Sequence, residues 1–384
     1  MNVIIVGTAY PLRGGIAHYN ALLASALKAR GHSVETITFK RQYPSIFFPG
    51  TSQDETGGGP HGDLAPRLVD SINPFNWWRV GRLLRRKRPD LLLFKYWIPF
   101  FGPCFGTIAA AARNQNLPRV VFICDNILPH ERRPFDRLFT RYAFRRADAF
   151  LVQSDAVERD LRVFWPGAHY RKSPHPVYDM FGPRLERSVA RSALGMASDE
   201  RVLLFFGYIR RYKGLEILLR AMRLVAARIK VRLHVVGEFY DDESTYRSLA
   251  HELDLDRCVT FHAGYLPNDR VAAFFSAADA VVLPYLSATQ SGIAQIAYHY
   301  DIPVIATDVG GLAEVVLDGR TGFVVPPADP TALAGAILRF YGENRAALFA
   351  AGVSQEKHRY SWDALVNAIE ELAGTANAAG GRPL

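Results

Sequence analysis

Residues 284–327 read PYLSATQSGIAQIAYHYDIPVIATDVGGLAEVVLDGRTGFVVPP, and this stretch decides the fold class. An apolar strand at residues 280–284 runs into a polar loop around Gly292, and a helix-like segment then leads to a second apolar strand at residues 303–307. A strand, a loop of small residues and a helix N-terminus together make an anion site, because free backbone N–H groups point in one direction and the helix dipole adds to them. Taken alone, the segment is explained equally well as an ordinary connection between a strand and a helix.

The same alternation of short apolar strands and helix-period segments runs through the whole chain. The further predicted strands lie at residues 2–6, 33–39, 90–94, 119–124 and 149–153 in the first half and at residues 202–206, 232–236 and 258–262 in the second. Alternating strands and helices indicate parallel sheets with helices on both faces. Two such series predict an α/β protein with two doubly wound, Rossmann-like domains, whose ligand lies in a cleft at the carboxyl ends of the strands.

Length and local composition predict where these domains begin and end. The chain has 384 residues, more than one ordinary core holds, so we expect two domains. The boundary falls in residues 173–183, SPHPVYDMFGP, which contain three prolines and little periodicity. We therefore expect an N-terminal domain at residues 1–177, a C-terminal domain at residues 178–359 and a disordered tail at residues 375–384. Residues 41–73 are rich in Gly, Pro and Ser and predict one long loop.

The composition indicates a soluble globular protein of a reducing compartment. Hydrophobic residues make up 49% of the chain, and its three scattered cysteines provide neither a disulfide framework nor a zinc-binding spacing. The sequence starts directly with the strand at residues 2–6, so we expect no secretory signal, and no apolar run is long enough to span a bilayer. These features predict a cytoplasmic protein.

The net charge of +9 is unevenly spread along the chain. Six of the ten residues 79–88 are Lys or Arg, and Trp77 and Trp78 come directly before them. A basic surface suits nucleic acid, an anionic membrane or a phosphorylated ligand, but no nucleic-acid-binding motif accompanies this one. Basic residues gain about 1 kcal/mol each near anionic lipid, and Trp favours the interface. The stretch predicts a peripheral position at the inner face of the membrane, although a solvated helix with its Trp side chains in the core explains it equally well.

A basic turn in the second half of the chain is a further anion site. The sequence GYIRRYKG at residues 207–214 places Arg210, Arg211 and Lys213 directly before a predicted helix. Cations beside a helix N-terminus suit a diphosphate, while a solvated basic loop is the ordinary alternative. In a two-domain parallel-sheet protein we expect this loop and the loop at residues 291–293 to open on the same cleft edge.

Several longer motifs carry a resemblance to a known family. In chain order they are the pair Gly14-Gly15, CDNILPHE at residues 124–131, RRADAFLVQS at residues 145–154, FGYIRRYKG at residues 206–214, PVIATDVGGLAEVVLDGRTGFVVPPADPTALAGAI at residues 303–337 and RYSWDALV at residues 359–366. By their joint order and spacing the chain resembles a GT-B glycosyltransferase of the retaining family 4 type over nearly its whole length. The resemblance implies two Rossmann-like domains facing a cleft, with residues 360–374 forming a helix that crosses back onto the N-terminal domain.

The resemblance also implies the residues of an active site. It implies that the donor, a nucleotide-diphosphate sugar, contacts Gly14, Gly15, Arg210, Lys213, Tyr265, Leu266, Thr289, Gln290, Ser291, Gly292 and Ile293. It implies catalytic roles for Asp125, which stands where the family has a histidine, and for His130. It further implies transfer with retention to a glycan or lipid-linked acceptor, with no metal, no cofactor apart from the nucleotide sugar and no nucleic acid.

The chain departs from the family pattern at the donor sugar, and this departure leaves alternatives open. The family motif EGFGLxxxE carries two glutamates, whereas TQSGIAQIA at residues 289–297 puts Thr289 and Ala297 in their places. A catalytically degenerate nucleotide-sugar-binding scaffold protein is therefore the main rival, and a sugar-nucleotide epimerase lacks a visible carboxylate pair. A D-x-D sequence, Asp254 to Asp256, serves metals in glycosyltransferases of another fold, but its place between a helix end and a strand predicts a turn and a cap.

Overall fold

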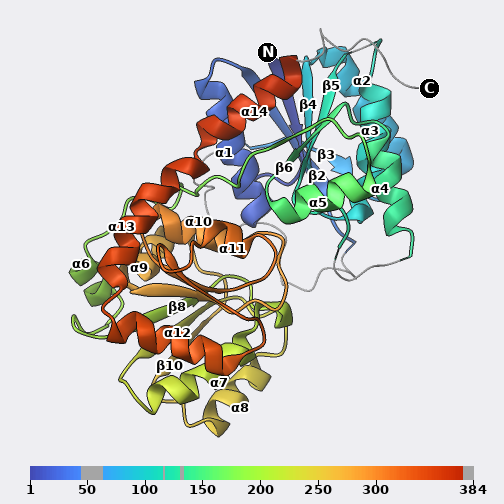
Figure 1. Cartoon of the computed structure of the whole chain (residues 1–384). Helices are drawn as coiled ribbons and strands as arrows, with labels where there is room; N and C mark the ends of the chain where they lie inside the picture. Colours follow the sequence, from blue (N-terminus) through green and yellow to red (C-terminus); the bar gives the residue numbers. More distant parts are fainter. Residues whose placement is uncertain (45–63, 116, 130–133, 375–384) are drawn as a thin grey trace. The chain divides into compact units, whose positions relative to one another are not determined.

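The computed structural model describes residues 1–44, 64–115, 117–129 and 134–374, and Figure 1 traces the chain. The chain divides into two compact units, Met1–Pro176 with the segment that starts at Ser361, and Val177–Tyr360. Each unit is built on one parallel sheet with helices packed against it, so the predicted α/β class with two doubly wound sheets is confirmed. The tail predicted at residues 375–384 lies outside the described residues.

The sheet of the first unit has seven strands in the order β3-β2-β1-β4-β5-β6-β7. Its strands are β1 (Asn2–Val6), β2 (Ser33–Arg41), β3 (Arg67–Asp70), β4 (Leu91–Tyr96), β5 (Arg119–Cys124), β6 (Ala149–Val152) and β7 (Tyr170–Lys172). Strand β1 pairs with β2 on one side and with β4 on the other, both parallel. The strand order therefore reverses between β1 and β4, and doubly wound sheets bind ligands at the carboxyl ends of strands beside such a reversal.

The sheet of the second unit has six strands in the order β10-β9-β8-β11-β12-β13. Its strands are β8 (Val202–Phe206), β9 (Arg232–Gly237), β10 (Val259–Ala263), β11 (Ala280–Leu283), β12 (Val304–Thr307) and β13 (Gly322–Val325). Strand β8 pairs in parallel with β9 and with β11, so the order reverses between β8 and β11. The loops that follow these two strands are the two anion sites that the sequence indicates.

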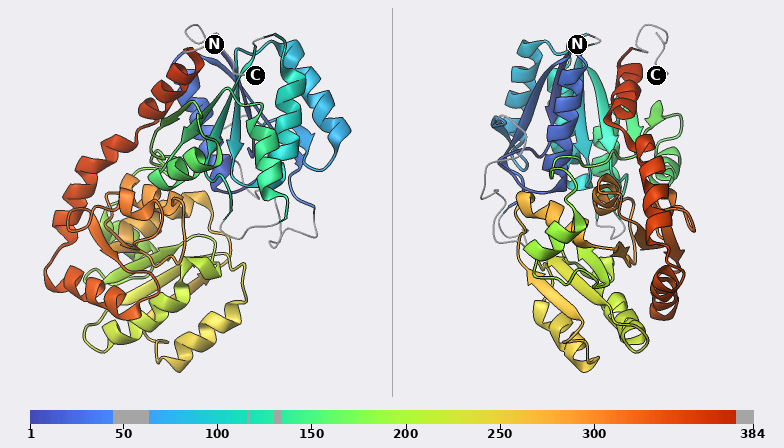
Figure 2. Two further views of the ribbon diagram at one scale, coloured as in Figure 1. Left: turned by 45° about the vertical axis from the view of Figure 1, so that its right-hand side comes forward. Right: turned by 90° about the vertical axis from the view of Figure 1, so that its left-hand side faces the viewer.

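Helices cover both faces of the first sheet. They are α1 (Gly15–Ala29), α2 (Pro74–Lys87), α3 (Gly102–Ala112), α4 (Asp136–Phe144), α5 (Asp155–Phe164) and α14 (Trp362–Gly374). Helix α3 packs against both α2 and α4 on one face, while α14, in red, lies beside α1, in blue, on the other (Figures 1 and 2). Glu370 fastens α14 to the end of α1 because its carboxylate accepts Nη2 of Arg30 at 2.8 Å and lies 2.8 Å from Nε2 of His32.

The helices of the second unit are α6 (Arg187–Ala193), α7 (Leu215–Ala226), α8 (Glu243–Glu252), α9 (Asn268–Ala277), α10 (Gly292–His299), α11 (Leu312–Val315), α12 (Pro330–Gly342) and α13 (Ala346–Glu356). Helix α7 packs against α8 and α12 on one face of the sheet, as Figure 1 shows. Its buried residues Leu215, Leu218, Met222 and Val225 repeat at helical spacing and join one apolar core with the sheet.

The predicted strands all form, but three strands were missed, and each of these lies at a sheet edge. Strands β3, β7 and β13 have four, three and four residues. Of these, β3 and β7 lack the continuous apolar run that marks a strand buried on both faces. The long loop predicted at residues 41–73 is accordingly wrong at both ends, because β2 extends to Arg41 and β3 starts at Arg67; residues 45–63 lie outside the described residues.

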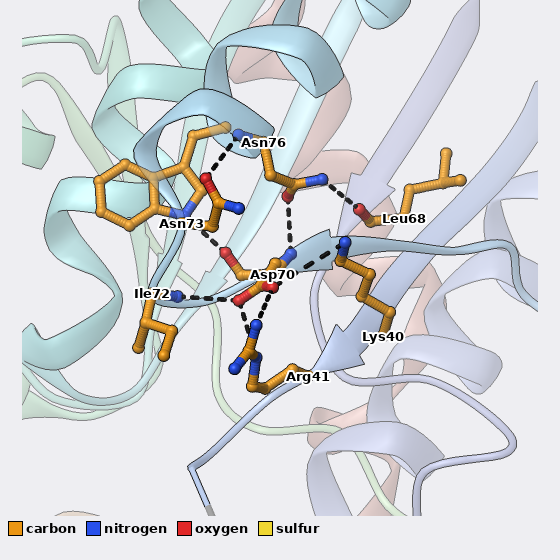
Figure 3. A network of polar contacts seen from close by, with 8 residues as sticks. Lys40, Arg41, Leu68, Asp70, Ile72, Asn73 and Asn76 are labelled. Atoms are coloured by element: carbon orange, nitrogen blue, oxygen red, sulfur yellow. Dashed lines mark hydrogen bonds and ion pairs between the residues drawn. The ribbon is translucent and has the colours of Figure 1, made fainter.

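Asp70, the last residue of β3, fastens β2 and α2 to the sheet edge (Figure 3). Its buried carboxylate accepts Nε of Arg41 at 3.0 Å, while its backbone N–H donates to Oδ1 of Asn76 at 2.7 Å. Its carbonyl oxygen accepts the indole Nε1 of Trp77 at 2.6 Å, and Trp77 packs against the core. Of the two tryptophans in the predicted membrane segment, Trp77 is therefore partly buried against the core, and Trp78 is 51% exposed.

Candidate functional site

The loops after β8 and β11 are locked together at the carboxyl edge of the second sheet. The backbone N–H of Leu286 donates to the carbonyl oxygen of Tyr212 at 2.7 Å. Gly214 has a φ of 71°, and a Cβ atom there would lie 1.9 Å from the carbonyl oxygen of Pro284. Only glycine combines the left-handed backbone with this close approach. Gly214 therefore ends the short turn Arg211–Lys213 and starts α7 with the two loops in contact.

Lys213 is the buried cation of this edge, with 7% of its surface exposed. A Cβ atom on Gly207 would lie 3.0 Å from Nζ of Lys213 and 3.2 Å from Cδ1 of Ile293, so the two side chains meet at Gly207. The Nζ atom also lies 5.7 Å from the ring centre of Tyr285. Burial first, and the charge of Arg210 second, lower the pKa of Lys213 to about 7. An anion placed beside this amine favours its charged form.

The N-terminus of α10 lies at the end of the same loop. Ser291 is the N-cap residue, but no side chain caps the first turn, so the first N–H groups of the helix are available to an anion. The Oγ atom of Ser291 lies 3.4 Å from the hydroxyl of Tyr285. The carbonyl oxygen of Thr289 accepts the N–H of Gly311 at 3.1 Å, which ties the loop to the turn after β12. A Cβ atom on Gly292 would lie 3.0 Å from Cε2 of Tyr178.

The other cations of the basic turn lie at the surface. Arg210 is exposed, and its guanidinium carbon lies 4.6 Å above the ring centre of Tyr240, a cation–π arrangement. Its charge reaches Lys213, since it contributes to the lowered pKa of that amine. Arg211 is exposed as well. The structure thus separates the turn into one buried amine and two arginines at its rim.

The loop with Tyr265 and Leu266 follows the edge strand β10 and joins the same sheet edge through backbone contacts. The N–H of Gly264 donates to the carbonyl oxygen of Gly237 at 3.1 Å. A Cβ atom on Gly237 would in turn lie 2.0 Å from the carbonyl oxygen of Gly207. Tyr265 and Leu266 are half-buried, as are Thr289 and Gln290 in the loop after β11. Half-buried side chains at this edge have surface left for a ligand.

Of the remaining predicted residues, Gly14, Gly15 and Asp125 lie in the described part of the first unit. Gly14 is the N-cap of α1, with a φ of 111° and no side-chain cap, and Gly15 starts the helix. Asp125 follows β5 directly, and its carboxylate Oδ1 accepts Nζ of Lys95 at 2.6 Å. His130 lies outside the described residues. Sequence reasoning missed Lys95, because a lone lysine inside the apolar strand LLLFKY carries no spacing signal.

Comparison with known proteins assigns the family. Residues 14–177 match a glycosyl transferase 4-like domain, and residues 200–343 match glycosyl transferases group 1. A D-inositol 3-phosphate glycosyltransferase from Streptomyces scabiei is 30% identical over 94% of this chain and 86% of its own length. The chain belongs to the glycosyl transferases group 1 family. The predicted family, the GT-B glycosyltransferases of the family 4 type, is confirmed at this level.

Other relatives of the same name match shorter segments. The relative from Corynebacterium urealyticum is 29% identical over 59% of this chain and 56% of its own length. For the relative from Acidothermus cellulolyticus the match spans 42% of its length. The chain thus spans about half the length of several curated relatives that it matches.

Solved structures of low identity share the fold of this group 1 glycosyltransferase. Sucrose-phosphate synthase from Thermosynechococcus elongatus superposes with a TM-score of 0.75 at 23% identity and covers 99% of this chain and 100% of that one. Anabaena HepE in complex with UDP-glucose gives a TM-score of 0.70 at 17% identity and covers 98% and 100%. Their agreement over both units supports the two-domain Rossmann-like assignment.

The D-x-D sequence forms the turn that its position predicts. Asp254 follows α8 with a left-handed φ of 54°, and Oδ2 of Asp256 lies 2.8 Å from Nδ1 of His251. Within the described ranges, no three His, Cys, Asp or Glu side chains gather as metal ligands would. Nor does any described helix have both the length and the apolar character that a bilayer span needs.

Proposed function

We propose that this glycosyltransferase moves a sugar from a nucleotide-diphosphate sugar to a hydroxyl-bearing acceptor, with retention of anomeric configuration and without a metal ion. The observation that carries the proposal is the buried amine of Lys213 beside Gly207, in the loop after β8. This loop is hydrogen-bonded to the loop after β11, which leads into the uncapped N-terminus of α10. Breaking the bond between sugar and diphosphate puts negative charge on the leaving group. Lys213, Arg210 and the N–H groups of α10 supply the opposing charge.

The nucleotide sugar fits the neighbouring loops in the same unit. The diphosphate lies between Lys213 and the first N–H groups of α10, while Tyr265 and Leu266 line the base pocket. Two structural neighbours support a donor of this class, since Anabaena HepE is solved in complex with UDP-glucose and a starch synthase IV catalytic domain from Arabidopsis thaliana is bound to ADP. Thr289 and Gln290 take the place of a charged contact to the sugar, so the donor is held by neutral hydrogen bonds.

The acceptor side belongs to the first unit. By the resemblance, Gly14 and Gly15 are proposed to contact the transferred sugar, and Asp125 and His130 are the proposed catalytic residues. The relatives are named D-inositol 3-phosphate glycosyltransferases. For this chain the proposed acceptor is a glycan or a lipid-linked sugar, reached at the inner face of the membrane.

Helix α2 supports the membrane part of the proposal. Phe75 is 84% exposed and Trp78 is 51% exposed, and the guanidinium of Arg82 lies 4.6 Å above the ring of Trp78. Apolar and basic side chains on one exposed helix match the chemistry of an anionic interface. Flotation with vesicles that contain phosphatidylglycerol tests it: wild type should float, and Phe75→Ser/Trp78→Ser should stay in solution. Val163→Ser, which removes an equally exposed apolar residue from α5, should float like wild type. Equal flotation with vesicles of phosphatidylcholine alone would contradict the proposed binding to an anionic membrane.

A panel of nucleotide sugars tests the central proposal. A donor that binds only the folded protein raises its melting temperature by mass action. The donor found in this way is then incubated with the enzyme and a mixture of lipid-linked and free glycan acceptors, with and without EDTA. Transfer or slow hydrolysis that EDTA leaves unchanged is the expected result. Binding without transfer or hydrolysis would favour the scaffold function. The supporting observation for that function is that Thr289 and Ala297 stand where the family motif has two glutamates.

A further inference from the structure

Lys95 is a fully buried cation at the switch point of the first sheet. It lies in β4, whose six residues LLLFKY are all buried, and only 1% of Lys95 is exposed. A Cβ atom on Gly7, which follows β1, would lie 3.3 Å from Cβ of Lys95. Lys95 therefore lies where the strand order reverses, beside the last residues of β1, β4 and β5.

Three groups surround the ammonium of Lys95. Its Nζ atom donates to Oδ1 of Asp125 at 2.6 Å and to Oε1 of Gln153 at 3.0 Å. It also lies 3.5 Å from the ring centre of Tyr19, whose hydroxyl accepts Nε2 of Gln153 at 3.0 Å. These contacts join β4, α1 and the residues that directly follow β5 and β6, all within the first unit.

Stability alone does not explain this network. Burying two charges costs several kcal/mol per ion, and apolar residues of similar volume are often as stable as a buried ion pair. The pair is also unequally buried, because the side chain of Asp125 keeps 14% of its surface exposed, against 1% for Lys95. The lysine thus lies behind the carboxylate, and the carboxylate has surface left for a ligand.

We propose that Lys95 is the positioning residue of Asp125: it holds the carboxylate in one orientation so that its exposed part accepts a hydrogen bond from the acceptor hydroxyl. The inference rests on the proposed function, since it supplies the partner of the proposed catalytic carboxylate. Gln153 and Tyr19 fix the ammonium from the other side. Because Lys95 and Asp125 carry opposite charges, the pair is neutral, and it suits a neutral hydroxyl of the acceptor better than a phosphate.

Asp125 is the acidic group that faces Lys95, whereas the neighbouring His175 and Cys124 are neutral at pH 7. Burial lowers the pKa of Lys95, and the charge and hydrogen bond of Asp125 offset this in part. Burial, and then the charge of Lys95, lower the pKa of His175 to about 3, so its ring is neutral at pH 7. Burial raises the pKa of the Cys124 thiol, which stays protonated. Tyr19 contributes its ring face and its hydroxyl.

Lysine NMR tests the pairing without any substrate. The Lys95 signal is identified by its loss in Lys95→Met and is followed from pH 6 to pH 11 in wild type and in Asp125→Asn. Because Asp125 favours the charged amine, Lys95 should lose its proton at a lower pH in Asp125→Asn than in wild type. Lys230→Met, which removes an exposed lysine, should leave the Lys95 titration unchanged. An unchanged Lys95 titration in Asp125→Asn would overturn the proposal.

Kinetics test the positioning role with the donor found by the nucleotide-sugar panel. In Lys95→Met kcat should fall ~100-fold, in the range of oriented acid–base groups, while KM for the donor stays within about threefold. Lys95→Arg should restore part of kcat. Should Lys95→Met not fold, Lys95→Met/Asp125→Asn removes both charges and should fold with the activity of Asp125→Asn. A wild-type kcat in Lys95→Met would contradict the role, whereas wild-type protein that turns over no nucleotide sugar would instead refute the proposed function and leave the NMR result standing.

Discussion

The lowered pKa of Lys213 predicts that donor binding takes up a proton. Burial and Arg210 bring the pKa of the free enzyme's amine to about 7, and a bound diphosphate raises it again. Below pH 7 the amine is already charged, and binding needs no proton. Above pH 7 the neutral amine must take up one proton first, so affinity is present at low pH and is lost as the pH rises.

The size of the effect follows from the fraction of charged amine. With a pKa of about 7, the charged fraction falls roughly 25-fold between pH 6.5 and pH 8.5, which corresponds to about 2 kcal/mol of binding free energy. A nucleotide sugar is the right probe for this window, because its doubly substituted diphosphate does not titrate there. The dissociation constant should rise by about this factor over the two pH units.

Calorimetry measures both the pH slope and the proton uptake. Binding of the nucleotide sugar is titrated at pH 6.5, 7.5 and 8.5 in buffers of different ionisation enthalpy, and the buffer dependence should show uptake of close to one proton at pH 8.5. Arg211→Ala, at an exposed neighbour in the same turn, should keep this slope. Lys213→Met should bind the nucleotide sugar weakly, and its affinity should not change between pH 6.5 and pH 8.5. A wild-type affinity that is constant from pH 6.5 to pH 8.5 would refute the reasoning.

Two further predictions concern stability. The folded-state pKa of Lys213 lies below its ordinary value of 10.5, so the unfolded chain binds more protons than the folded protein between about pH 7 and pH 10.5. The lysine therefore lowers the stability of the folded protein at pH 7. Lys213→Met should raise the melting temperature at pH 7 by at least about 2–4 °C, which corresponds to ~1 kcal/mol, and by less at pH 10. A lower melting temperature at pH 7 would contradict this. Gly214→Ala should cost about 1–3 kcal/mol more in urea unfolding than Gly195→Ala, because both glycines have positive φ but only a Cβ on Gly214 meets a carbonyl oxygen. Equal costs would show that the loops are not packed as closely as this.

The sequence predicted the central strands well because both faces of these strands are buried. The predicted bounds of β1, β5 and β8 agree with the structure to the residue, since each contains an apolar run of at least four residues. The edge strands β3 and β7 were missed because their sequences, RLVD and YRK, contain at most two adjacent apolar residues, whereas β13, GFVV, was missed although it is apolar. Sheet order and switch points depend on pairing between distant segments, and the alternation of strands and helices predicts only that such points exist.

The sequence predicted the candidate site residues that belong to contiguous motifs. It did not predict features that depend on contacts between distant segments of the chain. Lys213 and Gly292 come from contiguous motifs, and both lie at the switch point of the second sheet. That Lys213 is buried at Gly207 while Arg210 lies over Tyr240 depends on contacts between separate loops. Lys95 belongs to no motif, because its partners lie 30 or more residues away in the chain.

The stereochemistry of transfer tests the central claim most directly. The purified enzyme is given the α-linked nucleotide sugar that stabilises it most, and the anomeric proton of the first product is observed by NMR while the reaction runs. Retaining transfer predicts that the α-anomer of the product forms first, at a rate that Lys213→Met lowers and EDTA does not. A β-anomer as the first product would contradict retention, and no product from any nucleotide sugar would contradict the proposed enzyme activity.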